Sequence, residues 1–233
     1  MHRVNDRSRF AFGLPGELVL LAHKPRGGHY AINTDTVVAA AEVGELVLGE
    51  RVTLTGTRRS NFRVRLDDET PTGLSWLDEV LHQLRRKIRS STGSVSLASW
   101  FHARNGVFGN YRTRLVEHGA LRAERRSLLG IRYHRYFPEE RQREQLLDQV
   151  RAVVDHERAV DNRTALLAAL IHGSGLQWGL GLDRAQRRAL RALVRGEALG
   201  EAVDPLVTHA GAALAAAGGG GSDGGGGGDG GGG

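Results

Sequence analysis

The sequence contains no cysteine among its 233 residues. This absence excludes disulfide bonds and cysteine-based zinc sites, and it fits a protein of a reducing compartment. Long hydrophobic runs are also missing, since no stretch approaches the eighteen apolar residues of a membrane-spanning helix. The apolar run nearest the N-terminus, Leu18–Ala22, is too short for a signal peptide. We therefore expect a cytoplasmic protein, either free or bound peripherally to a membrane from the cytoplasmic side.

Common catalytic and metal-binding motifs are absent as well. None of the ten histidines lies in an H-E-x-x-H pair, and no G-x-x-x-x-G-K-[ST] phosphate loop occurs. Gly173-Ser174-Gly175 lacks the G-x-S-x-G pattern of a nucleophile elbow and is typical of a helix end. The neighbours Asp78 and Glu79 point in different directions on a helix, so they cannot share a proton-transfer site. The sequence predicts no enzyme activity, no cofactor and no metal site.

Lysine is almost absent, and arginine takes its place. Only Lys24 and Lys87 are lysines among the 32 basic residues. The segment from Arg85 to Arg143 holds fourteen basic residues and four glutamates, a surplus of ten positive charges. Because the whole chain carries a net charge of +6, the remainder is net −4. This clustering predicts a surface that binds an anionic partner.

The pattern of apolar residues predicts a mainly α-helical fold with small hairpins. Between Leu74 and Arg89 apolar residues recur at helical spacing, and Thr164–Ile171 is typical of a buried apolar helix. A loop at Ser90–Ser94 is expected to lead into a short helix at Val95–Ala103. Two alternating segments, Arg51–Leu54 and Phe62–Leu66, predict one β-hairpin.

Both ends of the chain differ from its body. Residues 218–233 are glycine apart from one serine and two aspartates, which predicts a disordered tail because nothing there can be buried. We expect residues 1–13 to be a flexible N-terminus. Residues 14–217 are expected to form a single helical domain.

The stretch Tyr111–Pro138 predicts a helix followed by a second, basic β-hairpin. The helix ends at Gly119, which suits the left-handed conformation that closes helices. Two alternating, arginine-rich segments follow, Ala120–Arg126 and Leu128–Phe137. Arginine binds phosphate with paired hydrogen bonds. Aromatic residues among cations suit either the headgroup level of a bilayer or stacking on bases.

Several short motifs recur in a familiar order. They are Gly16–Ala22 (GELVLLA), Gly44–Leu48 leading into Arg51–Leu54, Pro71-Thr72-Gly73 before Leu77-Asp78-Glu79, Leu115–Leu121 (LVEHGAL) and the apolar helix Thr164–His172. In this order and spacing they resemble the Golgi phosphoprotein 3 (GPP34) family, and its bacterial members in particular. The resemblance covers roughly residues 14–217.

This resemblance implies a GPP34-like fold, a single, mostly helical domain with protruding β-hairpins. It also implies a set of partners. The eukaryotic members bind phosphatidylinositol 4-phosphate at the Golgi face, bind cytoplasmic tails of glycosyltransferases and a vesicle coat, and self-associate through a hairpin. By resemblance, we expect a peripheral membrane protein that has the capacity to form a homo-oligomer.

The resemblance also places the lipid site. The tryptophan of the family falls on Tyr30, and one of its arginines falls on Ala39. The two arginines of the helix before L-V-E-x-G-x-L fall on Asn105 and Phe108, and a shift of one residue puts Arg104 at the first. We expect the headgroup site at Tyr30, Arg104, Arg112 and Arg114. The membrane-facing or self-association hairpin is expected at Arg125, Arg126, Leu128, Leu129, Arg132 and Tyr133.

Three kinds of partner remain open. The first is a phosphoinositide or another anionic lipid, because clustered charge alone contributes about 1 kcal/mol per basic residue near an anionic surface. The second is a protein tail, with the arginines binding acidic peptides. The third is nucleic acid, because residues 107–137 follow the order of a winged helix. Gly106-Val107-Phe108-Gly109 argues against the third, since it offers few polar side chains to base edges.

Overall fold

The computed structural model describes residues 13–30, 32–58, 61–91, 93–196 and 203–218. Most of the expected flexible N-terminus, residues 1–12, and the glycine tail from residue 219 onward lie outside the described residues. Helix α2 (Gly13–Ala22) opens the described part, and helix α10 (Pro205–Gly218) closes it. The helical body thus extends one residue beyond the expected boundary at each end.

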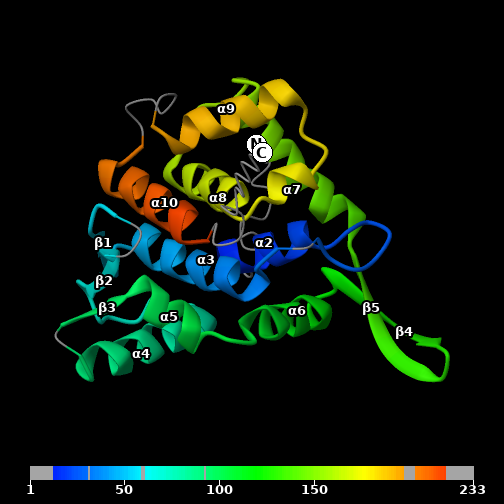
Figure 1. Cartoon of the computed structure of the whole chain (residues 1–233), viewed down its shortest axis with the longest axis horizontal. Coiled ribbons are helices and arrows are strands. Elements are labelled where there is room, and N and C mark those ends of the chain that lie inside the picture. The colour runs from blue at the N-terminus through cyan, green and yellow to red at the C-terminus, as the bar shows by residue number, and fades with distance from the viewer. Residues whose placement is uncertain (1–12, 31, 59–60, 92, 197–202, 219–233) are drawn as a thin grey trace, which may run out of the picture.

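The helices are arranged in three layers (Figure 1). The middle layer consists of α2 and α3 (Thr34–Leu48). One outer layer consists of α4 (Ser75–Arg89), α5 (Leu97–Ala103) and α6 (Val107–Glu117). The other consists of α7 (Glu140–Val154), α8 (Asn162–Gly173), α9 (Arg184–Val194) and α10, with the short 3-10 helix η2 (Leu176–Trp178) after α8.

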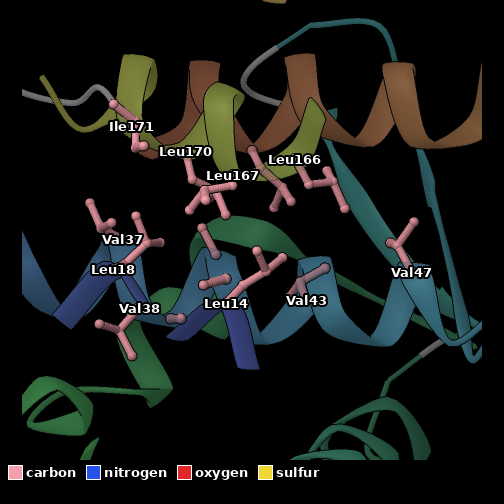
Figure 2. Packing of buried hydrophobic residues seen from close by; sticks show 14 of the residues in the cluster. Leu14, Leu18, Val37, Val38, Val43, Val47, Leu166, Leu167, Leu170 and Ile171 are labelled. Atoms are coloured by element: carbon pink, nitrogen blue, oxygen red, sulfur yellow. The ribbon is translucent and has the colours of Figure 1, made fainter. Parts of the chain in front are cut away.

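The middle layer is buried because its residues are small or apolar nearly throughout. Figure 2 shows Leu14 and Val37 pointing toward α8, whose Leu166 and Leu170 point back toward them. Gly44 lets α2 come close to α3, since a Cβ atom there would lie 3.3 Å from Leu14 Cδ1. Each fully buried aliphatic side chain contributes about 1.5–3 kcal/mol. This layer is therefore the centre of the hydrophobic core.

Helices α8 and α10 pack so closely that the backbone of one lies against the backbone of the other. A Cβ atom on Gly173 would lie 2.6 Å from the carbonyl oxygen of Ala215 and 2.9 Å from its carbonyl carbon. Neither backbone atom has freedom to move away. The crossing therefore requires glycine at this position for steric reasons.

A small antiparallel sheet closes one end of the layers. It has the order β1 (Val52–Thr55), β2 (Arg63–Leu66), β3 (Ser94–Ser96). The expected helix start at Val95 is wrong, and the expected loop ends one residue early, because Ser94 already belongs to β3. Val95 pairs with Val64 and both are buried, so this short segment forms a strand and α5 begins only at Leu97.

The second sheet is the basic hairpin, β4 (Leu121–Leu128) with β5 (Ile131–Pro138). It extends from the body at the lower right of Figure 1. A mainly α-helical body with small hairpins, one of which protrudes, confirms the fold class expected from the sequence.

Candidate functional site: the protruding hairpin and its base

The hairpin is fixed to the body at its base. Gly119 closes α6 with a φ of +74°, and the N–H of Ala120 donates to the Leu115 carbonyl at 2.8 Å. At the other end, the N–H of Glu139 donates to the Ala120 carbonyl at 2.8 Å. Leu121 is buried and anchors the first strand. The two strands then pair in regular register from Leu121–Pro138 to Leu128–Ile131.

The far end of the hairpin is apolar. We call Leu128, Leu129, Ile131 and Tyr133 the hairpin tip. Leu128, Leu129 and Ile131 are 65%, 94% and 72% exposed. In the described part of the chain, the other exposed large apolar side chains are Trp178 and Leu206 alone. An apolar cluster this exposed on a soluble surface marks a binding site for an apolar phase or partner.

The turn at the tip holds a leucine in an unfavourable conformation. Leu129 has a φ of +50° and Gly130 a φ of +82°. Two successive positive φ values are typical of the type I′ turn, which favours Asn-Gly or Asp-Gly. A leucine there costs about 1–2 kcal/mol relative to ordinary backbone conformations. An apolar side chain at this position is therefore not explained by folding of the turn.

Cations line the strands behind the tip. Arg122 and Arg126 both pair with Glu124, Arg126 at 2.5 Å. Arg125, Arg132 and Arg135 are exposed, and none forms an ion pair with another described residue. The hairpin thus combines an apolar end with guanidinium groups whose charge is not neutralised within the described structure.

Aromatic rings and guanidinium groups pack together at the hairpin base. Arg112 of α6 lies 4.2 Å from the ring centroid of Tyr136 and 5.9 Å from that of Phe108. Arg122 lies 5.2 Å from the ring centroid of Phe137. Such cation–π contacts contribute about 0.5–2 kcal/mol each. Arg112, expected at the headgroup site, is therefore beside the base of the hairpin.

A buried histidine lies under this base. His23 stacks on Phe108, with ring centroids 5.5 Å apart, and meets Tyr136 edge to face at 6.0 Å. Its Nδ1 lies 2.7 Å from the carbonyl oxygen of Val19, and its Nε2 is buried without a hydrogen-bond partner. Burial, the largest cause, lowers the pKa of His23 from 6.5 to about 4; the hydrogen bond with Val19 opposes this shift, and the nearby charges of His29 and Arg112 contribute to it.

Arg104, also expected at the headgroup site, is held by a buried carboxylate. Its guanidinium binds both carboxylate oxygens of Glu42, at 2.8 Å from Nε to Oε2, and also binds Gln83. Glu42 is fully buried, and the Tyr111 hydroxyl donates to it at 3.2 Å. Burial raises the pKa of Glu42, while the hydrogen bonds and charge of Arg104 oppose this. A phosphate could bind Arg104 only by competing with Glu42.

The remaining two expected residues lie in separate surroundings. Tyr30 packs on Gly179, with Lys24 Nζ 5.2 Å from its ring centroid. Arg114 pairs with Glu79 at 3.3 Å. Within the described residues, no hydrogen bond, ion pair or ring contact joins Tyr30 to the three arginines expected beside it.

The positions at which the resemblance expects further arginines are mostly core. Ala39 and Phe108 are both buried. The N-terminus of α6, next to these positions, already binds a carboxylate. Asp35 accepts hydrogen bonds from the N–H groups of Gly106 and Phe108, both at 2.9 Å. This helix end therefore carries an anion from the chain itself.

Within the described residues, no group of three or more histidine, aspartate or glutamate side chains is placed to hold a metal ion. No helix of the described structure is both long enough and apolar enough to cross a membrane.

Sequence reasoning missed two surface features. One is Trp178, the exposed tryptophan of η2. The other is α9, which carries four arginines and no acidic residue: Arg184, Arg187, Arg188 and Arg191. The four arginines of α9 are apparent in the sequence, but they lie outside the basic segment 85–143.

Comparison with known proteins supports the resemblance. A search of curated proteins found no match. The family model described as Golgi phosphoprotein 3 (GPP34) matches residues 14–210, which is most of the chain and includes every helix from α3 to α9 together with both sheets. The chain therefore belongs to the Golgi phosphoprotein 3 (GPP34) family.

Proposed function

We propose that this protein is a non-enzymatic peripheral membrane protein that binds anionic lipids through its protruding hairpin, from the cytoplasmic side. The observation that carries the proposal is the combination of an exposed apolar tip with unpaired arginines directly behind it. Membership of the GPP34 family supports it.

Both parts of the hairpin contribute to such binding. Transfer of an exposed leucine or isoleucine side chain into an apolar phase is favourable by about 1.5–3 kcal/mol. Each arginine held near an anionic surface adds about 1 kcal/mol. The tip would enter the boundary between headgroups and acyl chains, and Arg125, Arg132 and Arg135 would remain among the phosphates.

We propose binding to anionic headgroups in general, and not to one phosphoinositide, because of the surroundings of Arg104. This arginine is engaged by Glu42, so selective recognition of one phosphoinositide has no preformed set of free donors there. Arg112 and Arg114 lie nearer the surface on α6, and the pair between Arg114 and Glu79 is exposed. Exposed ion pairs contribute little and exchange partners readily.

Vesicle co-sedimentation tests the proposal. The protein is mixed with vesicles of phosphatidylcholine alone, with added phosphatidylserine, and with phosphatidylinositol 4-phosphate at matched charge. We expect binding to both anionic kinds at low salt and weaker binding at high salt. No binding to either anionic vesicle would refute the proposal, and preference for the phosphoinositide at equal charge would show a selective site.

Single arginines provide matched variants. Arg132→Gln removes one unpaired charge from the hairpin and is expected to weaken vesicle binding about fivefold. Arg58→Gln removes another exposed charge, near β1, at the end of the body opposite the hairpin in Figure 1, and is expected to leave binding unchanged. Equal losses in both variants would point to net charge rather than to the hairpin.

Self-association would bury the same apolar tip. Light scattering of the protein in solution, with and without the Leu128→Ser change, therefore accompanies the vesicle assay. If the wild type forms a dimer or tetramer that dissociates in this variant, and the variant binds vesicles as tightly as the wild type, the tip makes protein contacts and does not bind lipid.

A further inference from the structure

Trp178 is the exposed tryptophan of this protein. It is 68% exposed, whereas Trp100 is fully buried and Trp76 is packed against the core. An exposed aromatic residue alone has no special meaning. Its surroundings give it one, because a cation lies beside its ring and a second aromatic ring packs on the next residue of the chain.

Arg187 lies beside the Trp178 ring, and Tyr30, with Lys24 over its ring, packs on the next residue of the chain, Gly179. The guanidinium carbon of Arg187 is 4.7 Å from the centroid of the Trp178 ring. Tyr30 packs directly on Gly179, where a Cβ atom would lie 2.5 Å from the tyrosine ring. Lys24 lies over the ring of Tyr30, with its Nζ 5.2 Å from the ring centroid. We call Lys24, Tyr30, Trp178 and Arg187 the Trp178 surface.

The Trp178 surface is continuous with the hairpin base. The turn that carries Lys24 also carries Gly27, where a Cβ atom would lie 2.9 Å from the ring of Phe137 and 3.2 Å from Nε of Arg135. Both of these residues belong to β5. In Figure 1 the blue loop that follows α2 lies at the right of the body, on the side from which the hairpin extends. A flat partner that meets the hairpin is therefore adjacent to this loop.

The charge of the neighbouring helix fits an anionic partner. Helix α9 has four arginines, and none of them forms an ion pair with a described residue. Arg184 and Arg188 are exposed near Arg187, at the end of α9 that follows the Trp178 segment. Unneutralised guanidinium groups beside an exposed indole are suited to phosphates at the surface of a bilayer, where tryptophan and tyrosine rings are enriched.

We propose that the Trp178 surface is a second contact with the same anionic bilayer, with the Trp178 ring at headgroup level and Lys24 and Arg187 among lipid phosphates. This inference rests on the proposed function. It adds a contact outside the hairpin and outside the basic segment 85–143, and it fixes the orientation of the body on the membrane, with η2 and the 24–30 loop facing the lipid.

Tryptophan fluorescence tests the proposal. The full-length protein is added to vesicles of phosphatidylcholine and phosphatidylserine in equal amounts, with and without a lipid that carries a quencher near its headgroup. Because Trp76 and Trp100 are packed in the protein, we expect the vesicle-dependent blue shift and quenching to come from Trp178. Trp178→Phe should remove both changes.

Binding by co-sedimentation gives the second measurement. Trp178→Ala is expected to weaken vesicle binding about tenfold, through the lost burial of one large ring. Leu206→Ala, which removes another exposed apolar side chain from α10, is the control and should bind like the wild type.

The outcomes separate this inference from the proposed function. If the wild type sediments with anionic vesicles but Trp178 emission is neither shifted nor quenched, the second contact is refuted and lipid binding by the hairpin stands. If Trp178→Ala binds as tightly as the wild type, the contact contributes nothing and is likewise refuted. If the wild type does not sediment, both proposals fall.

Discussion

Replacement of Leu129 by asparagine should stabilise the fold and weaken membrane binding at the same time. Leu129 lies in the turn of the hairpin with a φ of +50° and is 94% exposed. Its side chain has almost no contact in the folded protein to lose. The variant creates an Asn-Gly pair, the sequence that the type I′ turn favours.

The two magnitudes follow from the geometry. A leucine in the left-handed region costs about 1–2 kcal/mol, and asparagine relieves part of that cost, so the free energy of unfolding should rise by about 0.5–1 kcal/mol. If the tip enters the bilayer as proposed, the variant loses burial of one leucine there, about 2 kcal/mol. That loss corresponds to roughly thirty-fold weaker vesicle binding.

Urea unfolding followed by circular dichroism measures the first effect, and vesicle co-sedimentation measures the second. Leu206→Asn is the control, because Leu206 is also exposed but lies in helix α10. It should not be stabilised, and it should bind vesicles like the wild type. If Leu129→Asn binds as tightly as the wild type, the tip does not enter the membrane. If the variant is less stable, the leucine conformation was not the source of strain.

Three other changes test the body. His23→Asn keeps a hydrogen-bond donor for the end of α2 but cannot titrate. Because the pKa of His23 is lowered from 6.5 to about 4 in the folded state, the free energy of unfolding of the wild type should fall by about 3 kcal/mol more than that of the variant between pH 7 and pH 4. Urea unfolding at each pH measures this difference. Gly173→Ala should lower the free energy of unfolding by at least about 2 kcal/mol, because its Cβ meets the backbone of Ala215. Glu42→Gln should cost about 3 kcal/mol by leaving the Arg104 charge poorly compensated, as urea unfolding would show.

Each of these changes has a matched control on an exposed or open site. His82→Asn makes the same replacement at an exposed histidine and is the control for His23→Asn. Gly109→Ala lies within α6 with nothing within 4 Å of the new Cβ, so it should be neutral or stabilise by up to about 1 kcal/mol. Glu79→Gln breaks an exposed pair and should cost less than about 1 kcal/mol. A loss in any control as large as in its partner would contradict the reasoning.

The elements that local pattern determines were predictable. Helix α4 follows from apolar residues at helical spacing, and the basic hairpin follows from alternation after Gly119. Strand β3 was not predictable, because Ser94–Ser96 carries a single apolar residue. It becomes a strand only because β2 offers it a partner about thirty residues earlier in the chain.

The site was predictable in part, for the same reason. The arginines and apolar residues of the hairpin are neighbours in sequence, so their common surface follows from the strand pairing. The state of Arg104 does not, because its partner Glu42 lies 62 residues away and looks like an ordinary polar helix residue in the sequence. Tyr30 comes close to the Trp178 segment only through its contact with Gly179, which no periodicity in the sequence predicts.

Asp35 competes with any external anion for the N–H groups at the start of α6. Its carboxylate, in the first turn of α3, accepts hydrogen bonds from two N–H groups at the start of α6. Because the carboxylate is part of the same molecule, its effective concentration at that helix end is of the order of millimolar or higher. A free phosphate or a sparse headgroup must outcompete it there. Selectivity among lipids would therefore depend on how densely the bilayer presents its charge.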